Sequence, residues 1–157
     1  MRIELTGDIE KRLRAALREA GGREIGGMLL GEQLAPGRFC VVDFSLDRLS
    51  GSHTTFRRDP ETHRQTLEEF FKRTGQNFER FNYLGEWHSH PSFSVHPSKD
   101  DICTMTEIVE DRSAIINFAV LFIVRLRLRL WIDHSLTVFA RGELPQLSQI
   151  CRRAVWI

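Results

Sequence analysis

The sequence predicts an α/β fold with a single mixed β-sheet flanked by helices, and three observations lead to this prediction. Stretches with helical periodicity alternate with short strand-like stretches along the chain. Turn signals rich in glycine or proline separate them. The composition is globular, with 41% hydrophobic and 27% charged residues among 157. A chain of this length is expected to form a single domain, residues 1–157.

The first half of the chain predicts strands around one helix. The expected elements are a strand over residues 2–5, a helix over 8–20, and strands over 24–31, 38–46 and 53–57. Thr6 is placed to cap the helix, and the Gly21-Gly22 pair ends it. Two central glycines, Gly26 and Gly27, weaken the second strand, and such glycines often mark a close approach of backbone or ligand.

The second half predicts two more helices and further strands. The expected elements are a helix over residues 60–75, a strand over 81–87, a helix over 98–109, strand-like chain over 114–140 and a short helix over 143–157. Arginines and leucines alternate over residues 125–130 with a strict period of two, which is typical of a solvated strand face.

Charge and composition exclude several classes of partner. The formal net charge is +1, so no bulk electrostatic attraction to nucleic acid or to a membrane is expected. The longest apolar run, residues 114–124, is too short to cross a bilayer. The N-terminus carries no apolar signal-peptide segment, and three cysteines without a Cys-x-x-Cys pair fit a reducing compartment. A cytoplasmic protein is expected.

Two histidines and a carboxylate predict a metal centre. His88 and His90 are two residues apart at the end of a predicted strand, so both side chains point to the same face. Asp101 lies in the first turn of the next predicted helix, where Ser98 can act as the cap. Two histidines and one carboxylate are a ligand set of catalytic Zn²⁺ sites that keep a position open for water.

A zinc hydrolase also needs a carboxylate that accepts a proton from the attacking water. Two glutamates compete for this role. Glu86 is close in sequence to His88 and has the same strand parity, whereas Glu24 lies just before the strand that contains Gly26. Spacing alone does not decide between them.

Together these residues resemble the motif of the JAMM (MPN-plus) zinc metalloproteases. The motif consists of Glu24, then His88-x-His90, seven intervening residues, Ser98, two residues and Asp101, and the order of flanking elements agrees over roughly residues 8–140. The resemblance implies an MPN/JAB-like fold with cytidine-deaminase-like architecture. It further implies that both histidines and Asp101 ligate Zn²⁺, that Glu24 is the acid/base, and that Ser98 donates a hydrogen bond to the tetrahedral oxyanion.

Members of that family cleave isopeptide or peptide bonds after the C-terminal tail of ubiquitin or ubiquitin-like proteins. The chain is similar to small bacterial members, which occur in operons with E1- and E2-like enzymes, including antiphage systems. The resemblance thus implies deconjugation or precursor processing, with a ubiquitin-like protein or its conjugate as substrate and the E1- and E2-like enzymes as further partners. Two alternatives stay open: a catalytically silent MPN scaffold, and a hydrolase that releases an amino acid or small amine from a carrier protein.

Overall fold

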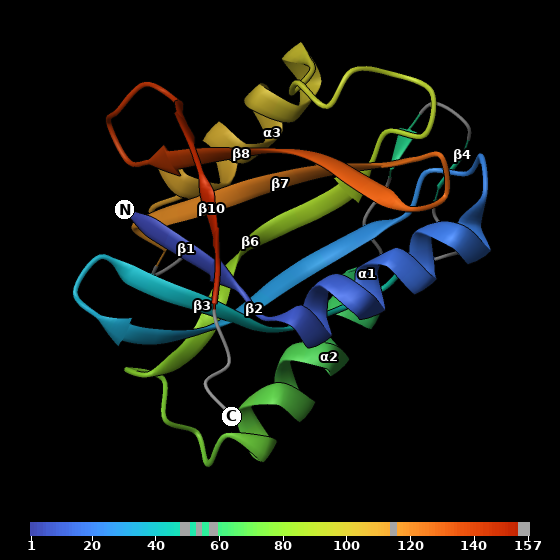
Figure 1. The fold of residues 1–157 in the computed structure, drawn as a ribbon. Coiled ribbons are helices and arrows are strands. Elements are labelled where there is room, and N and C mark those ends of the chain that lie inside the picture. The colour runs from blue at the N-terminus through green and yellow to red at the C-terminus, as the bar shows by residue number, and fades with distance from the viewer. Residues whose placement is uncertain (48–50, 53–54, 57–59, 114–115, 154–157) are drawn as a thin grey trace.

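A computed structural model gives the fold and describes residues 1–47, 51–52, 55–56, 60–113 and 116–153 (Figure 1). The helices are α1 (Gly7–Ala20), α2 (Pro60–Arg73) and α3 (Lys99–Glu110). The strands are β1 (Arg2–Leu5), β2 (Gly26–Ala35), β3 (Arg38–Phe44), β4 (Gly51–Ser52), β5 (Thr55–Phe56), β6 (Phe81–Ser89), β7 (Phe118–Arg127), β8 (Trp131–Ala140), β9 (Gln146–Ser148) and β10 (Ile150–Arg152).

Eight strands form one sheet in the order β10-β1-β3-β2-β6-β7-β8-β9, and β4 pairs with β5 separately. The pairs β1–β10, β1–β3 and β6–β7 are parallel, and the other pairs of the large sheet are antiparallel. The predicted mixed sheet is therefore confirmed. β6 lies in its interior, between antiparallel β2 and parallel β7, and this position decides which side chains meet at its end.

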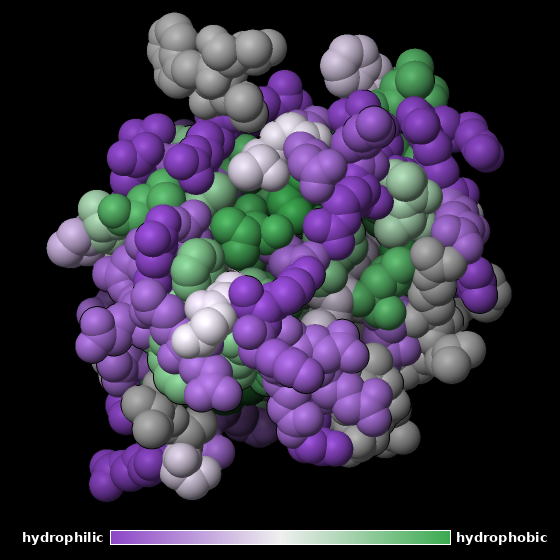
Figure 2. Space-filling view, turned by 90° about the horizontal axis from the view of Figure 1, so that it is seen from below, coloured by the Kyte–Doolittle hydropathy of each residue, from purple (hydrophilic) through white to green (hydrophobic). Residues whose placement is uncertain are grey.

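The helices cover both faces of the sheet. α1 buries an apolar stripe that includes Leu13 and Leu17 against a core cluster containing Trp87. On the opposite face, α3 packs Met105 against β7, and α2 packs Phe70 against β2. Seen from below the view of Figure 1, the surface is mostly hydrophilic, with hydrophobic residues gathered in separate areas near its middle (Figure 2).

Local signals for the helix ends agree with the prediction. The N–H of Ile9 donates to the Thr6 side chain at 3.3 Å, which caps α1, and Gly21 follows the helix with φ +62°. Ser98 caps α3 through a reciprocal capping box with Asp101. Within the described part of the chain, no helix combines the length and hydropathy needed to cross a membrane.

The C-terminal segment departs from the prediction. A helix over residues 143–157 is wrong as far as the structure describes this segment, because β9 pairs with β8 and β10 pairs with β1; residues 154–157 lie outside the described residues. Both partner strands would otherwise be sheet edges with unpaired backbone groups. Pairing with these distant strands outweighs the weak local helix propensity.

The strand-like stretch over residues 114–140 is two strands. β7 and β8 form a hairpin that turns at residues 128–130, so the arginine–leucine alternation does not continue as a strand through Arg129. Leu128 and Arg129 both have positive φ, at 49° and 57°. Hairpin turns of this kind usually carry Asn or Gly, and the sequence here gives no such signal.

Candidate metal centre

The candidate metal centre lies at the C-terminal end of β6. His88 pairs with Gly26 of β2 on one side and with Ile123 of β7 on the other. β6 ends at Ser89, yet the N–H of His90 still donates to the carbonyl oxygen of Val124 at 2.9 Å. This bond continues the strand path by one residue, so the two imidazoles stay on the same face.

The three side chains predicted as ligands come together. The Nε2 atoms of His88 and His90 are 3.0 Å apart, and Oδ1 of Asp101 lies 3.5 Å from Nε2 of His88. One donor atom from each residue falls within 4.8 Å of the others. Two imidazole nitrogens and one carboxylate oxygen at such separations suit a single zinc ion.

The capping box of α3 orients Asp101. The backbone N–H and the hydroxyl of Ser98 both donate to Asp101 Oδ2 at 2.7 Å, and the N–H of Asp101 donates back to Ser98 Oγ at 3.1 Å. These bonds occupy Oδ2 and leave Oδ1 facing His88. The same short motif therefore starts the helix and aims the carboxylate.

A backbone contact orients the His90 ring. Its Nδ1 atom lies 2.6 Å from the carbonyl oxygen of Ser94, which can only accept a hydrogen bond. Nδ1 therefore carries the proton, and Nε2 presents a lone pair toward His88. Metal-bound histidines commonly have their second nitrogen fixed in this way, so His90 fits the role of a ligand.

His88 is buried and uncharged at neutral pH. Burial lowers the pKa of His88 to about 4, and the opposing effect of the Asp101 charge is smaller. A metal binds the neutral imidazole, so this histidine needs no proton loss at pH 7 to act as a ligand.

Glu24 is held beside these three residues by the end of β6. The Ile25 N–H donates to Ser89 Oγ at 3.0 Å, and the Ser89 N–H donates to the carbonyl oxygen of Ile25 at 2.8 Å. The Glu24 side chain is buried, and this burial raises the pKa of its carboxyl group. The charges of His90 and Asp101 also act on this pKa, in opposite directions, as expected for near neighbours.

Sequence reasoning did not identify Ser89 as part of this arrangement. Its side chain points away from the histidines and binds the backbone that carries Glu24. The only signal was a polar residue between the histidines, which is also common at strand ends.

The competing carboxylate, Glu86, is engaged elsewhere on the strand. It is buried, and its Oε1 accepts a hydrogen bond from the Tyr83 hydroxyl at 3.2 Å. The pKa of Glu24 responds to the charges of two of the candidate ligands, His90 and Asp101. Glu24 is therefore close enough to the candidate ligands to feel their charges, as the resemblance implies for the acid/base.

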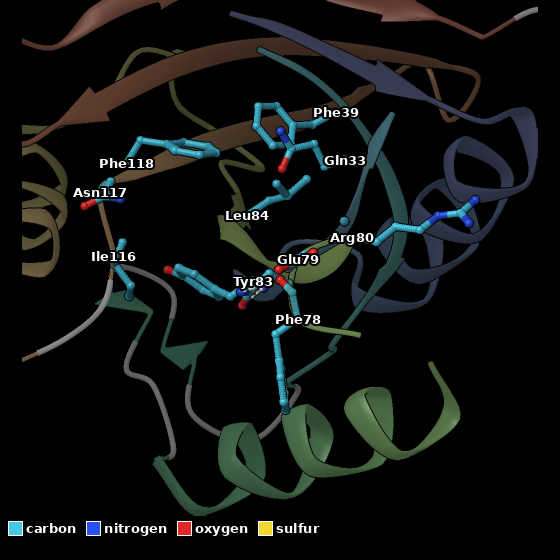
Figure 3. Close-up of a pocket in the computed structure, with 12 residues that line it drawn as sticks. Gln33, Phe39, Phe78, Glu79, Arg80, Tyr83, Leu84, Ile116, Asn117 and Phe118 are labelled. Atoms are coloured by element: carbon cyan, nitrogen blue, oxygen red, sulfur yellow. Dashed lines mark hydrogen bonds between the residues drawn. The ribbon is translucent and has the colours of Figure 1, made fainter. Parts of the chain in front are cut away.

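A pocket of about 170 Å³ lies at the other end of β6 (Figure 3). Its lining includes Tyr83 and Leu84 of β6, Phe118 at the start of β7, and the polar side chains of Gln33 and Asn117. β6 runs from this pocket toward His88, so the pocket is separate from the candidate metal centre.

A mixed α/β fold with a His-His-Asp group at a strand end defines a candidate metalloprotein. Residues 7–133 match the family described as prokaryotic homologs of the JAB domain, and the chain belongs to this family. The expected MPN/JAB-like fold is confirmed.

One curated relative is the "CD-NTase/cGAS isopeptidase" of Enterobacter hormaechei subsp. hoffmannii (strain UCI 50), 36% identical over 93 residues. The match covers 57% of this chain, and the chain spans about half, 48%, of that relative.

Two solution structures share the fold. A protein from Desulfitobacterium hafniense aligns with a TM-score of 0.72 and 20% identity over 96% of this chain and 92% of its own. A protein from Salinibacter ruber (strain DSM 13855) aligns with a TM-score of 0.59 and 22% identity over 98% of this chain and 92% of its own. At such identities the likeness concerns the fold alone.

Proposed function

We propose that this protein is a zinc-dependent isopeptidase or peptidase that cleaves after the C-terminal tail of a ubiquitin-like or similarly conjugated protein. The observation that carries the proposal is the convergence of His88, His90 and Asp101, with buried Glu24 held next to them. The His-His-Asp group would hold the metal. A zinc ion bound there would polarise the scissile carbonyl and lower the pKa of its bound water to about 7.

The chain itself supplies the proton transfers. The Glu24 carboxylate accepts a proton from the attacking water and returns it to the leaving amine nitrogen. Burial raises the pKa of this carboxyl group, which makes the carboxylate a stronger base than an exposed one. Both proton transfers use the Glu24 side chain, so both depend on its position beside the candidate metal centre.

Ser98 stabilises the charge that develops on the carbonyl oxygen. Its hydroxyl now donates to Asp101 Oδ2, which also accepts the Ser98 N–H. The hydroxyl can therefore turn toward substrate while Asp101 keeps one of these bonds. A single donor of this kind contributes roughly 2.7–4 kcal/mol to lowering a barrier.

The family and the relative's name support the substrate class. Because the Enterobacter relative is named an isopeptidase, we propose that the substrate is a protein joined through its C-terminus to an amine of a target. The proposed setting is the bacterial cytoplasm, in an antiphage conjugation system with E1- and E2-like enzymes. Residues 1–157 are proposed to form one such catalytic domain.

A substrate panel tests the proposal. The zinc-loaded protein is incubated with a ubiquitin-like protein and a CD-NTase-type enzyme, each linked through its C-terminus to a lysine side chain, and with short amides. Mass spectrometry should show both protein products from at least one conjugate, with no release after chelation. Cleavage of small amides alone would instead indicate a carrier-directed hydrolase. No cleavage of any substrate by zinc-loaded protein would indicate a silent scaffold.

A further inference from the structure

We propose that the tip of the β7–β8 hairpin, residues 127–131, is the docking surface for the body of the protein whose tail is cleaved. The complementary surface on that partner presents an apolar patch bordered by carboxylates. This inference rests on the proposed function and adds the surface that binds the substrate.

The hairpin tip exposes large apolar side chains next to one another. Leu128 is 83% exposed, Leu130 57% and Trp131 67%. Single exposed apolar residues are ordinary on a protein surface, but a contiguous group is typical of an interaction site. Three such residues within four consecutive positions form a group of this kind.

The backbone of the tip is strained. Leu128 and Arg129 are both in the left-handed region, with φ 49° and 57°, and the Leu130 N–H donates to the Arg127 carbonyl oxygen at 2.9 Å. The left-handed conformation costs a non-glycine residue roughly 1–2 kcal/mol of conformational free energy. An Asn-Gly pair at these two positions would avoid most of this cost. The turn thus carries an exposed leucine where folding alone favours a different residue, and such strain is often linked to function.

The tip is anchored to the rest of the protein. Arg18 of α1 donates through Nε to the carbonyl oxygen of Arg129 at 3.0 Å. β7 and β8 are paired in continuous register up to Arg127 and Trp131. The apolar side chains are therefore presented from a defined position.

The tip and the candidate metal centre share one end of the sheet, and Arg127 and its partner Trp131 lie on the face of His88. Ile123 lies beside His88, and Arg127 follows four residues later with the same parity, about 13 Å farther along the strand. The loop after His90 also lies against the hairpin (Figure 1). Arg125 of β7 donates to the carbonyl oxygen of Phe93 at 2.9 Å, and the hydroxyl of Ser135 in β8 donates to the carbonyl oxygen of Val95. A distance of 13 Å corresponds to about four extended residues, so a folded protein whose tail reaches the centre can lie over the tip.

The charges at the tip favour an acidic partner. Arg18, Arg127 and Arg129 are exposed around the apolar side chains. The acidic group of the hairpin, Asp133, pairs with Arg125 at 2.9 Å and with Arg127 at 3.6 Å. The positive charge therefore exceeds the negative charge here, and tryptophan and arginine are the residues that contribute most often to binding at interfaces.

The test replaces the strained turn by a relaxed one. The double variant Leu128→Asn/Arg129→Gly should fold with equal or greater stability, because it installs the preferred turn residues. On a conjugate that the wild type cleaves, the double variant should show a KM raised roughly tenfold or more and an unchanged kcat. On a short amide with the same scissile bond, the double variant and the wild type should have the same KM and kcat. Trp131→Ala should show the same split. Leu144→Ser, which changes a leucine that is 85% exposed beyond the other end of β8, is the matched control.

Each other outcome contradicts the docking surface. An unchanged KM for the conjugate in both tip variants removes the tip from substrate binding. The wild type and the tip variants are also tested for binding to phosphatidylserine vesicles and for self-association. If the wild type does either and the tip variants do not, while the KM for the conjugate is unchanged, the tip belongs to a membrane contact or to a contact with a second copy. If the zinc-loaded wild type cleaves neither substrate, the proposed function fails and this inference fails with it.

Discussion

Asp101 uses its two carboxylate oxygens for different purposes. Oδ2 accepts both hydrogen bonds from Ser98, and Oδ1 faces Nε2 of His88. The Ser-x-x-Asp spacing predicted the helix start, and the same local geometry turns the second oxygen of Asp101 toward His88. Local geometry of this kind can be predicted from sequence.

Asp101→Ala should reduce the affinity for zinc by at least about a hundredfold, since an open three-ligand site would lose its only carboxylate. Ser98→Ala is the comparison: it removes a capping bond, at a cost of about 1 kcal/mol, but keeps the carboxylate and the backbone N–H that orients it, so its loss of zinc affinity should be smaller. Competition with a zinc-sensitive dye measures both variants. Equal zinc affinity for Asp101→Ala and the wild type would remove Asp101 from the ligand set.

Glu24→Gln should lower kcat by roughly 10²–10⁴ while zinc stays bound, because the amide cannot accept the proton from water. Glu86→Gln serves as the comparison, and it should keep most of the turnover. Single-turnover kinetics and metal analysis are run on the same samples. If the Glu86 variant were inactive and the Glu24 variant active, the two assignments would be exchanged.

Glu4 of β1 links stability to pH. Its buried carboxylate accepts a hydrogen bond from Arg38 Nε at 2.7 Å, and this bond, with the charges of Arg38 and Arg2, keeps the pKa of Glu4 below its ordinary value. A depressed folded pKa contributes stability above the unfolded pKa, and this contribution is lost as the pH falls through the folded value.

Glu4→Gln should therefore reduce the free energy of unfolding more at pH 7 than at pH 3. Urea denaturation at the two pH values measures the difference. An equal loss at both would show that the charge on Glu4 adds nothing to stability.

At the scale of elements, the contact between β6 and β7 depends on Gly85. This residue has φ +150°, and a Cβ atom built there would lie 2.0 Å from the Val120 carbonyl oxygen. No side chain fits at this separation, so the parallel pair that positions His88 beside Ile123 requires glycine.

Gly85→Ala should destabilise the protein by about 1–3 kcal/mol or more, because the two backbones must separate. Gly22→Ala is the control: a Cβ there meets nothing within 4 Å, and a change within about 0.5 kcal/mol is expected. Thermal and urea unfolding give both values. A stable Gly85→Ala protein with unchanged zinc affinity would show that this contact is not critical.

Elements with strong local signals were predicted and those that depend on distant pairing were not. The caps of α1 and α3 are encoded within three or four residues, as are the strand parities of His88 and His90. By contrast, β10 exists because it pairs with β1, whose sequence lies far away. Residue spacing alone likewise left Glu24 and Glu86 open, and the resemblance implied Glu24; the pairing that places Gly26 beside His88 is a long-range contact that the sequence does not encode locally.

At the scale of the whole molecule, the two ends of the sheet differ in character. One end brings together Glu24, the His-His-Asp group and the exposed tip of the β7–β8 hairpin. The other end carries the pocket of Figure 3, to which no role is assigned. The proposed chemistry and the proposed substrate docking therefore use the same end of the molecule.

The most direct test is anomalous X-ray scattering from crystals of the zinc-loaded protein, measured on both sides of the zinc absorption edge. We predict one anomalous difference peak, at about 2.0–2.2 Å from each of Nε2 of His88, Nε2 of His90 and Oδ1 of Asp101. A peak ligated by other residues, or zinc-soaked crystals with no peak between these three atoms, would contradict the account.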